Sequence, residues 1–178
     1  MKELAGRDAI VTGSARNIGR ATALSLADAG AAIVVHGAAQ SAEAEATLRD
    51  VRAKGVKAAL VFGDAADPAT SEALVAAAVS ELGALDIVVS NAAARSNVPF
   101  QKQSRAEFER IVAVAFGGTY NLVHIAVPEL IKGAENGRKG IGRINAIFCP
   151  GGSPTDPDTC QVRNDFRGDG LANFVTSD

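Results

Sequence analysis

The residues best suited to chemistry in this chain form a glycine-containing turn close to residue 13. Gly13 and Gly19 enclose a short polar stretch that follows the apolar run Ala9–Thr12 and precedes an apolar, helix-like run. A strand that turns directly into a helix points the first N–H groups of the helix, and the positive end of its dipole, at a phosphate. Gly13 permits a positive φ in the turn, and Gly19 permits a close approach of the helix to the strand or to a pyrophosphate. The spacing therefore predicts a phosphate-binding loop.

The composition restricts the classes of protein that can carry this loop. Hydrophobic residues make up 47% of the 178 residues and aromatic residues only 4%, so we expect one core of Ala, Val, Leu and Ile between helices and a parallel sheet. The net charge of −2 offers no basic surface for nucleic acid. No continuous apolar run reaches the roughly 18 residues of a membrane span. Cys149 and Cys160 are too few and too far apart for a zinc or redox motif. We therefore expect a cytoplasmic protein without a metal site, a nucleic-acid partner or a membrane segment.

Strand-like and helix-like segments alternate along residues 1–148. Strands are expected at Ala9–Thr12, Ala32–His36, Lys57–Phe62, Asp86–Ser90 and Arg143–Phe148, and helices at Ile18–Ala29, Ser41–Lys54, Pro68–Leu82 and Arg105–Lys132. Ser41 and the pair Ser104 and Glu107 are expected to cap two of these helices, and Pro128 is expected to kink or end the last one. The alternation predicts an α/β fold, a Rossmann-like doubly wound parallel sheet of about five strands. Residues 149–178 are rich in Pro, Gly, Ser, Thr and Asp and are expected to form an irregular tail.

Five short motifs follow one another along residues 1 to about 148. They are Thr12–Gly19, Asp64 after the third expected strand, Ser90–Ala93, Phe116–Tyr120 and Gly142–Asn145. In this order and at this spacing they resemble the motifs of the short-chain dehydrogenase/reductase family. Asn17 stands in place of one glycine of the family's loop, and Asn accepts unusual backbone angles better than most residues. The resemblance implies an NAD(P)-binding oxidoreductase whose first five strands lie in the order 3-2-1-4-5.

The resemblance also implies where the cofactor would bind. It assigns cofactor contacts to Gly13, Ser14, Arg16, Asn17, Ile18 and Gly19 of the loop, and to Asp64 and Asn91 after the third and fourth strands. In the family an Asp at the position of Asp64 lies beside the adenine ring. This Asp could equally cap the turn before Pro68. Asn91 could bridge neighbouring strands through their backbone groups, which is a structural role close to the cofactor.

The residues after the second strand bear on the choice between NAD and NADP. A carboxylate there would bind the ribose 2′-hydroxyl group and repel a 2′-phosphate. The chain instead has His36 followed by Gly37 and two alanines, and Arg16 can reach a phosphate. This pattern favours NADP over NAD. The alternative is that Arg16 is merely solvated, and we assign no role to His36.

The chemistry that the resemblance implies depends on four residues that the sequence does not hold. The family uses an Asn on the fourth helix, a Ser after the fifth strand, and a Tyr-x-x-x-Lys motif whose Lys lowers the pKa of the Tyr for proton transfer. Ala115 stands at the Asn position, and Phe148 or Cys149 at the Ser position. No Tyr follows Tyr120 and no Lys follows Lys139, so the motif cannot occur. We therefore predict no catalytic residue, with turnover absent or severely impaired.

Three interpretations of function remain open. The first is an NADP-dependent oxidoreductase, acting on a carbonyl or hydroxyl substrate, whose chemistry is impaired. The second is a non-catalytic protein that binds NADP or another nucleotide, or an interaction partner. The third is a truncated or frameshifted product.

The fourth helix bears on self-association. Tyr120 and His124 lie one helical turn apart, and we expect Tyr120 to pack in the core or at an interface rather than to act in catalysis. In the family, a fifth helix packs beside the fourth and a further strand pairs with the fifth. This sequence shows neither, so the apolar run Ile111–Phe116 and the edge of the fifth strand are expected to be exposed. We therefore expect a monomer of marginal stability or a homo-oligomer.

Overall fold

Five parallel strands form the sheet, in the order β3-β2-β1-β4-β5. The computed structural model describes residues 2–135 and 143–146, which lie within one compact unit, Met1–Ile147. The strands are β1 Asp8–Val11, β2 Ala32–Gly37, β3 Ala58–Phe62, β4 Ile87–Ser90 and β5 Arg143–Ala146. The α/β fold, the parallel pairing and the order of the first five strands are as predicted. The expected tail at 149–178 and the last two residues of the expected fifth strand lie outside the described residues.

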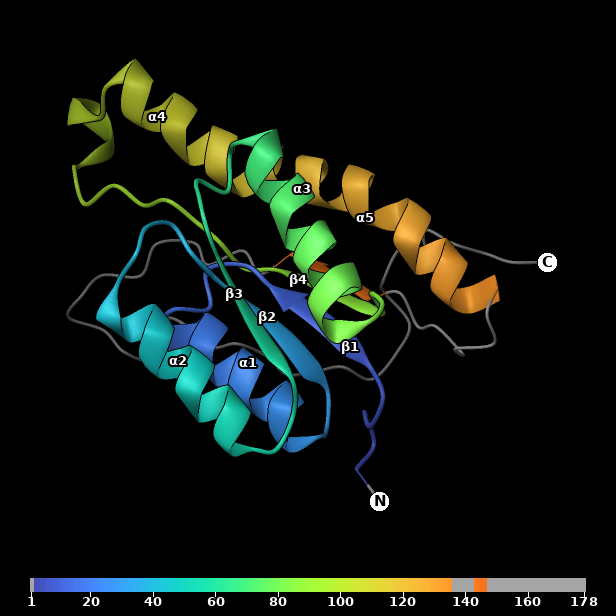
Figure 1. Cartoon of the computed structure of the whole chain (residues 1–178). Coiled ribbons are helices and arrows are strands. Elements are labelled where there is room, and N and C mark those ends of the chain that lie inside the picture. Colours follow the sequence, from blue (N-terminus) through green and yellow to red (C-terminus); the bar gives the residue numbers. More distant parts are fainter. Residues whose placement is uncertain (1, 136–142, 147–178) are drawn as a thin grey trace. The chain divides into compact units, whose positions relative to one another are not determined.

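Helices cover both faces of the sheet (Figure 1). On one face lie α1 Asn17–Asp28 and α2 Ala42–Ala53, and on the other lie α3 Pro68–Ala77 and α5 Gly118–Glu135. A π-helical turn, η1 Ala78–Leu82, continues α3. A short 3₁₀ turn, η2 Phe100–Lys102, precedes α4 Arg105–Val112, and a second π-helical turn, η3 Ala113–Gly117, joins α4 to α5. The helices connect strands that are all parallel. The carboxyl ends of all five strands therefore lie at one edge of the sheet.

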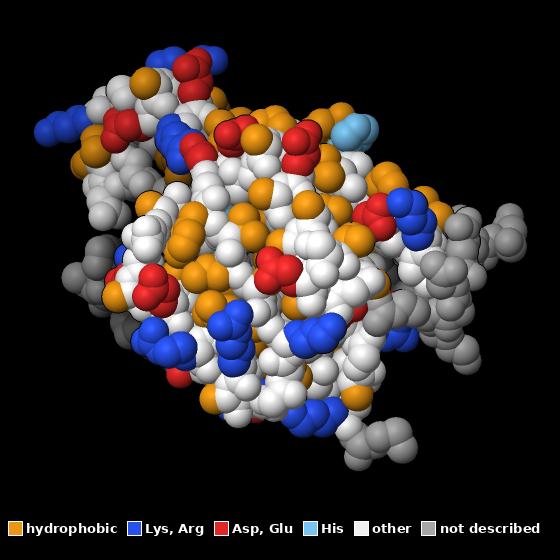
Figure 2. Space-filling model, viewed as in Figure 1, with side chains coloured by type: hydrophobic (Ala, Val, Ile, Leu, Met, Phe, Trp, Pro, Cys, Tyr) orange, Lys and Arg blue, Asp and Glu red, His pale blue; other side chains and the backbone are white. Residues whose placement is uncertain are grey.

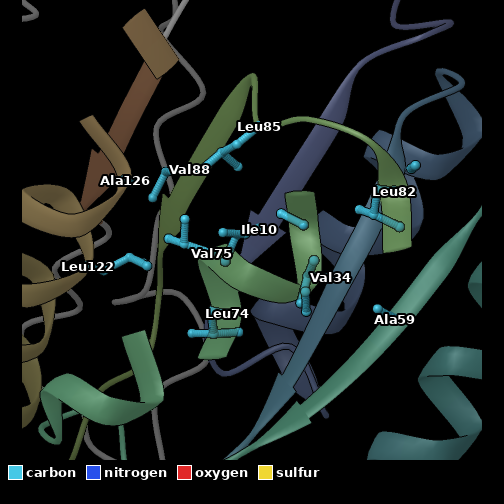
Figure 3. Close-up of a cluster of buried hydrophobic side chains, with 13 residues drawn as sticks. Ile10, Val34, Ala59, Leu74, Val75, Leu82, Leu85, Val88, Leu122 and Ala126 are labelled. Atoms are coloured by element: carbon cyan, nitrogen blue, oxygen red, sulfur yellow. The ribbon is translucent and has the colours of Figure 1, made fainter. Parts of the chain in front are cut away.

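Alternate residues of the strands β1 to β4 enter two separate cores. Ile10, Val34 and Val88 point toward α3 and α5, where they pack with Leu74 and Leu122 (Figure 3). Their neighbours along the strands, which include Val11, Ile33 and Val35, pack against the alanine-rich face of α1 and against α2. The two cores contain aliphatic side chains, as the composition predicted. They fix β1 between β2 and β4 and so determine where the loops at the strand ends lie.

The helix caps agree with the sequence. The side chain of Ser41 accepts a hydrogen bond from the N–H of Ala44, and Ser104 and Glu107 form a complete capping box. The N-cap of α3 is Asp67, whose side chain accepts from the N–H of Ala69. Asp64 instead accepts from the N–H of Ala66 in the preceding turn, at 3.0 Å. The predicted turn role of Asp64 is therefore confirmed, while the helix cap belongs to Asp67.

The expected helix Arg105–Lys132 differs from the structure in two ways. The turn η3 interrupts it, because five residues there adopt the wider π-helical winding. Pro128 does not end it, since α5 continues to Glu135. A proline removes one backbone hydrogen bond, and the packing of α5 on α3 and β4 outweighs that loss. Of the two expected effects of Pro128, an end of the regular helix does not occur, and a kink stays a prediction.

Tyr120 is also placed differently from one of its expected positions. Its side chain is 67% exposed, so the prediction of core packing is wrong. The ring stacks on His124 with their centroids 5.7 Å apart. The core face of α5 is instead occupied by Leu122 and Ala126, which are two and six residues further along the helix.

The continuous helical stretch Arg105–Gly133 is long enough to span a membrane and contains an 18-residue window with a mean hydropathy of 1.5. In the described part of the chain it is the one helix that meets this test, which core helices of water-soluble proteins also meet. The finding is weak evidence for a membrane segment.

Candidate functional site

The loops after β1, β2, β3 and β4 meet at the carboxyl edge of the sheet. Hydrogen bonds join them directly: the loop after β1 bonds to His36 of β2 and to Asn91 after β4, and His36 bonds to Gly63 after β3. Ligands of open α/β sheets bind in the crevice outside this edge. The structure therefore brings together the predicted loop, Asp64 and Asn91.

Thr12 and Asn91 join β1 to β4 beyond the last paired residues of the strands. The hydroxyl group of Thr12 accepts hydrogen bonds from the backbone N–H groups of Asn91 and Ala92, at 2.9 and 3.0 Å. The side-chain amide of Asn91 donates to the carbonyl oxygens of Thr12 and Gly13, at 2.9 and 3.3 Å. The predicted bridging role of Asn91 is thus confirmed. The side chain of Thr12 contributes equally to this connection between β1 and β4, a role that was not predicted from the sequence.

The two glycines of the loop are required by its backbone and by its packing. Gly13 has a φ of +63°, which favours glycine. A Cβ on Gly19 would lie 2.5 Å from the amide nitrogen of Asn91 and still closer to the carbonyl oxygen of Gly13. The close packing predicted at Gly19 is therefore present, against Gly13 just after β1 and Asn91 just after β4, and the approach to a pyrophosphate stays a prediction. Asn17 has a φ of +52°, so the expectation that an Asn accepts this unusual conformation is confirmed.

His36 holds three loops together and is the main residue of the site that the sequence analysis left without a role. Its side chain is 1% exposed. Nδ1 accepts a hydrogen bond from the N–H of Gly13 at 3.0 Å, and Nε2 lies 3.0 Å from the carbonyl oxygen of Gly63. Since Nδ1 is an acceptor, Nε2 carries the proton and donates to Gly63. Burial lowers the pKa of His36, which keeps the ring in this neutral form at neutral pH.

Ser14 uses its side chain within the protein. Its hydroxyl group donates to the carbonyl oxygen of Val11 at 2.7 Å and accepts from the N–H of His36 at 2.9 Å. The side chain is fully buried. A bound ligand would therefore meet the backbone of Ser14 rather than its hydroxyl group.

Arg16 and Asn17 form the exposed part of the loop, directly at the N-terminus of α1. Arg16 is the N-cap residue of this helix, and its side chain makes no capping hydrogen bond. Ala38, Ala39 and Gln40, which follow β2, are exposed as well. The loop thus presents one cation and the start of a helix to the solvent, and none of these five exposed residues is a carboxylate.

Asp64 forms an ion pair with Arg110 of α4. Two nitrogens of the guanidinium group contact the carboxylate, with Nη1 2.6 Å from Oδ2 and Nη2 3.0 Å from Oδ1. This pairing, together with the hydrogen bond from Ala66, holds the pKa of Asp64 below its usual value. The carboxylate is therefore an acceptor throughout the neutral range. Arg110 could not be predicted from the sequence, because it lies 46 residues from Asp64 and carries no local signal of the contact.

Two further contacts fasten the loop after β3 to α5. The side-chain amide of Asn121 donates to the carbonyl oxygen of Ala66 at 3.2 Å. Gly118 packs so closely on this loop that a Cβ there would lie 2.5 Å from the carbonyl oxygen of Ala65. Next to the loop, a cavity of about 300 Å³ lies between residues 94–96 and the first turns of α4, and Arg110 lines it.

The position of Ala115 offers no side chain for proton transfer. Its carbonyl oxygen accepts a hydrogen bond from the hydroxyl group of Thr119 at 2.6 Å. Ser90 in turn donates to Thr119 at 2.7 Å, since the proton of Thr119 is used. Within residues 2–135 and 143–146, no group of His, Cys, Asp and Glu side chains is arranged to hold a metal ion. Phe148 and Cys149, at the predicted Ser position, lie outside the described residues.

Comparisons with known proteins agree with this arrangement. A sequence model of the family described as "short chain dehydrogenase" matches residues 7–146. The chain is 30% identical over 126 residues to a 3-oxoacyl-[acyl-carrier-protein] reductase, FabG, of Staphylococcus aureus, covering 71% of this chain and 51% of that protein. It is 34% identical over 137 residues to an L-rhamnose 1-dehydrogenase (NAD(P)(+)) of a Sphingomonas species, covering 77% and 54%. It is 37% identical over 142 residues to the hydroxyacyl-CoA dehydrogenase ChsB1 of Mycobacterium tuberculosis, covering 76% and 44%.

A solved structure has the same fold. The crystal structure of a short chain dehydrogenase from Mycobacterium avium superposes with a TM-score of 0.72 and 28% sequence identity, covering 80% of this chain and 52% of that one. The chain thus spans about half the length of the relatives it matches.

Proposed function

Because the chain belongs to the short-chain dehydrogenase family, whose members are oxidoreductases that bind NAD or NADP, we propose that it binds NADP at the carboxyl edge of its sheet. The proposed contacts are the loop residues Gly13, Ser14, Arg16, Asn17, Ile18 and Gly19, together with Asp64 and Asn91. One observation carries this proposal. The loop after β1 is fixed by part-buried hydrogen bonds, donated by the N–H of Gly13 to His36 and by the side-chain amide of Asn91 to Gly13, and it presents the N-terminus of α1 to the solvent. Such a helix end attracts a pyrophosphate.

The proposed preference for NADP rests on charge. Arg16 is exposed at the start of α1, and no acid occurs between His36 and Ser41. A guanidinium group binds the 2′-phosphate of NADP well, whereas a carboxylate would repel it. NAD is the less favoured cofactor.

We propose that this chain binds the dinucleotide without turning it over. Losing a general acid alone removes about 10²–10⁴-fold of rate. Here Ala115 supplies no polar side chain, and the sequence holds no Tyr-x-x-x-Lys motif. The Lys of that motif would hold the nicotinamide ribose, and none of the proposed contact residues replaces it. We therefore expect the adenosine half of the dinucleotide to provide most of the affinity. The second candidate function is reduction or oxidation of a carbonyl or hydroxyl compound, which the family relationship favours.

Calorimetric titration of the purified chain tests the proposal. We expect saturable binding of NADP⁺, and an affinity for 2′,5′-ADP within about threefold of it. Arg16→Gln should weaken NADP⁺ binding by about tenfold, the value of one hydrogen bond to a charged group, and should change NAD⁺ binding by less than twofold. Arg105→Gln, which removes another exposed arginine, is the control and should leave both affinities unchanged.

The titrations separate the alternatives. Absence of saturable binding for NADP⁺, NAD⁺ and 2′,5′-ADP would overturn the proposed function. An equal loss of NAD⁺ and NADP⁺ affinity in Arg16→Gln would overturn the preference for NADP. Oxidation of NADPH with a carbonyl compound at ordinary enzyme rates would replace binding without turnover by the second candidate function.

Self-association is proposed from one exposed apolar stripe. Phe108, Val112, Phe116 and Tyr120 follow one another at intervals of four residues and are 36–67% exposed. Figure 2 shows hydrophobic side chains gathered along this side of the molecule, over α4 and α5. An apolar surface of this kind favours burial against a second copy. Light scattering should give a mass above that of one chain, and Phe116→Ser should lower it.

We also propose a cytoplasmic location, where NADP is available and the two cysteines would remain thiols.

A further inference from the structure

The ion pair between Arg110 and Asp64 lies in a position where it contributes little to folding. The two side chains remain 52% and 44% exposed, and exposed ion pairs are weak because water screens them. The loop that carries Asp64 is already fastened to α5 by Asn121 and by the close packing of Gly118. The pair nevertheless has a specific, bidentate geometry, in which two nitrogens of the guanidinium group contact the two oxygens of the carboxylate.

The hydrogen bonds of Asp64 leave one of its acceptor positions available. A carboxylate has about four lone-pair positions. Arg110 occupies one on each oxygen, and the N–H of Ala66 occupies a second on Oδ1. One position on Oδ2 remains for a donor from a ligand. Because the carboxylate stays ionised, that position can receive a hydrogen bond but cannot give one.

This acceptor lies among the residues of the proposed dinucleotide site. Asp64 directly follows Gly63, whose carbonyl oxygen accepts from His36. His36 in turn receives the N–H of Gly13 in the glycine loop. Two hydrogen bonds, from Gly13 to His36 and from His36 to Gly63, therefore connect the glycine loop to the residue before Asp64. The available position on Oδ2 lies at the same edge of the sheet as the backbone that the pyrophosphate would approach.

We propose that Arg110 is a positioning residue that orients the carboxylate of Asp64 to receive the exocyclic amino group of adenine, and so selects the base of the bound dinucleotide. The inference rests on the proposed function. Hypoxanthine carries a carbonyl oxygen in place of that amino group, so the two acceptors would face each other without a proton between them. Without Arg110 the carboxylate keeps one fixed hydrogen bond, from Ala66, and can rotate about its side chain. A lysine would keep the charge and lose the fork that sets the plane of the carboxylate.

Binding of NADP⁺ and of its deaminated analogue, nicotinamide hypoxanthine dinucleotide phosphate, tests this role. The two ligands carry the same phosphates, so their affinity ratio reports the base alone. In the unmodified chain we expect NADP⁺ to bind about tenfold more tightly. Arg110→Gln should reduce this ratio to about twofold, and Arg110→Lys should give an intermediate value. Arg105→Gln removes an exposed arginine of the same helix, paired with Glu109 at 2.7 Å, and should keep the full ratio.

Thermal melting of each variant accompanies the titrations, so that loss of folding is not mistaken for loss of selectivity. Asp64→Asn provides a second approach, because its amide keeps the shape of the side chain and halves the number of acceptor oxygens. It should also lower the ratio. If Arg110→Gln is folded and keeps a tenfold ratio, or if the unmodified chain binds both ligands equally, the role of Arg110 is wrong while dinucleotide binding stands. If the unmodified chain binds neither ligand, the proposed function itself fails.

Discussion

Two groups of polar side chains lie at the same edge of the sheet and differ in burial. Thr12, Ser14 and His36 are at most 4% exposed, and together with Asn91 they bond mainly to backbone groups of neighbouring loops. Asp64 and Arg110 bond to each other through charged side chains that remain about half exposed. The buried group fixes the shape of the backbone. The exposed pair makes one hydrogen bond to the backbone, from the N–H of Ala66 to Asp64, and otherwise orients one carboxylate.

This difference predicts how each group responds to substitution. A buried polar group that loses its partner keeps the full cost of its desolvation, whereas an exposed group regains water. Substitutions in the buried group should therefore lower stability first and ligand binding as a consequence. Substitutions in the exposed pair should alter ligand binding with little change in stability.

The largest effect is expected for Gly19→Ala. The new Cβ would meet the carbonyl oxygen of Gly13 and the amide of Asn91, both parts of the buried group. We expect the free energy of unfolding, measured by urea denaturation, to fall by about 3 kcal/mol. Gly117→Ala is the matched control, since a Cβ there meets nothing within 4 Å. A loss below about 1 kcal/mol in Gly19→Ala would show that the loop adapts and that its packing is loose.

A smaller effect is expected when the pH is lowered. The pKa of His36 is below 6.5 in the folded protein because of burial. As the pH falls below 6.5, the unfolded chain binds a proton that the folded chain does not, so the free energy of unfolding decreases. The slope can reach about 1.4 kcal/mol per pH unit. Above about pH 7.5, His36 should contribute no slope.

Variants assign this slope to one residue. The sequence has only two histidines, His36 and His124. His36→Asn should abolish the slope between pH 6.5 and 5, while His124→Gln, on the exposed face of α5, should keep it. Asp64 and Glu107 have lowered pKa values, so their contributions are lost only at lower pH, below their ordinary values of 3.8 and 4.5. A slope that persists in His36→Asn would place the responsible proton elsewhere.

The smallest effect on stability is expected for the exposed pair. Arg110→Gln, Asp64→Asn and the double variant form a cycle in which the coupling energy should be at most about 1 kcal/mol. Urea denaturation in 0.05 M and 0.5 M salt measures this coupling and its screening. A coupling well above that value, unchanged by salt, would mean that the pair belongs with the buried group after all.

Much of the fold could be predicted because its signals are local. The strands β1 to β4 lie within one or two residues of their predicted bounds, and the caps at Ser41 and Ser104 are where the sequence placed them. The turns η1 and η3 could not be predicted in the same way. A π-helical turn uses the same helix-forming residues as its neighbours and differs only in hydrogen-bond spacing.

The candidate site was predicted less completely, because its contacts join distant segments. The glycine loop and the bridging by Asn91 followed from motifs. The link from His36 to Gly63, 27 residues away, and the pair of Asp64 with Arg110 required the packed structure. The burial of Tyr120 could not be predicted for the same reason. An aromatic residue on α5 is buried only if another element covers its side of the helix, and that depends on the packed structure.

The order in which β1 finds its neighbours also affects how the chain folds during synthesis. Asp8 pairs with Ala32 early in the sequence, whereas Thr12 receives the N–H of Asn91, 79 residues away. At a synthesis rate of about 5–20 residues per second, roughly 4–16 s pass between these two residues. Between the synthesis of β2 and that of β4 the central strand has a partner on one side only, and contacts of such long sequence separation form slowly. The glycine loop cannot complete its hydrogen bonds until Asn91, 79 residues after Thr12, has been made.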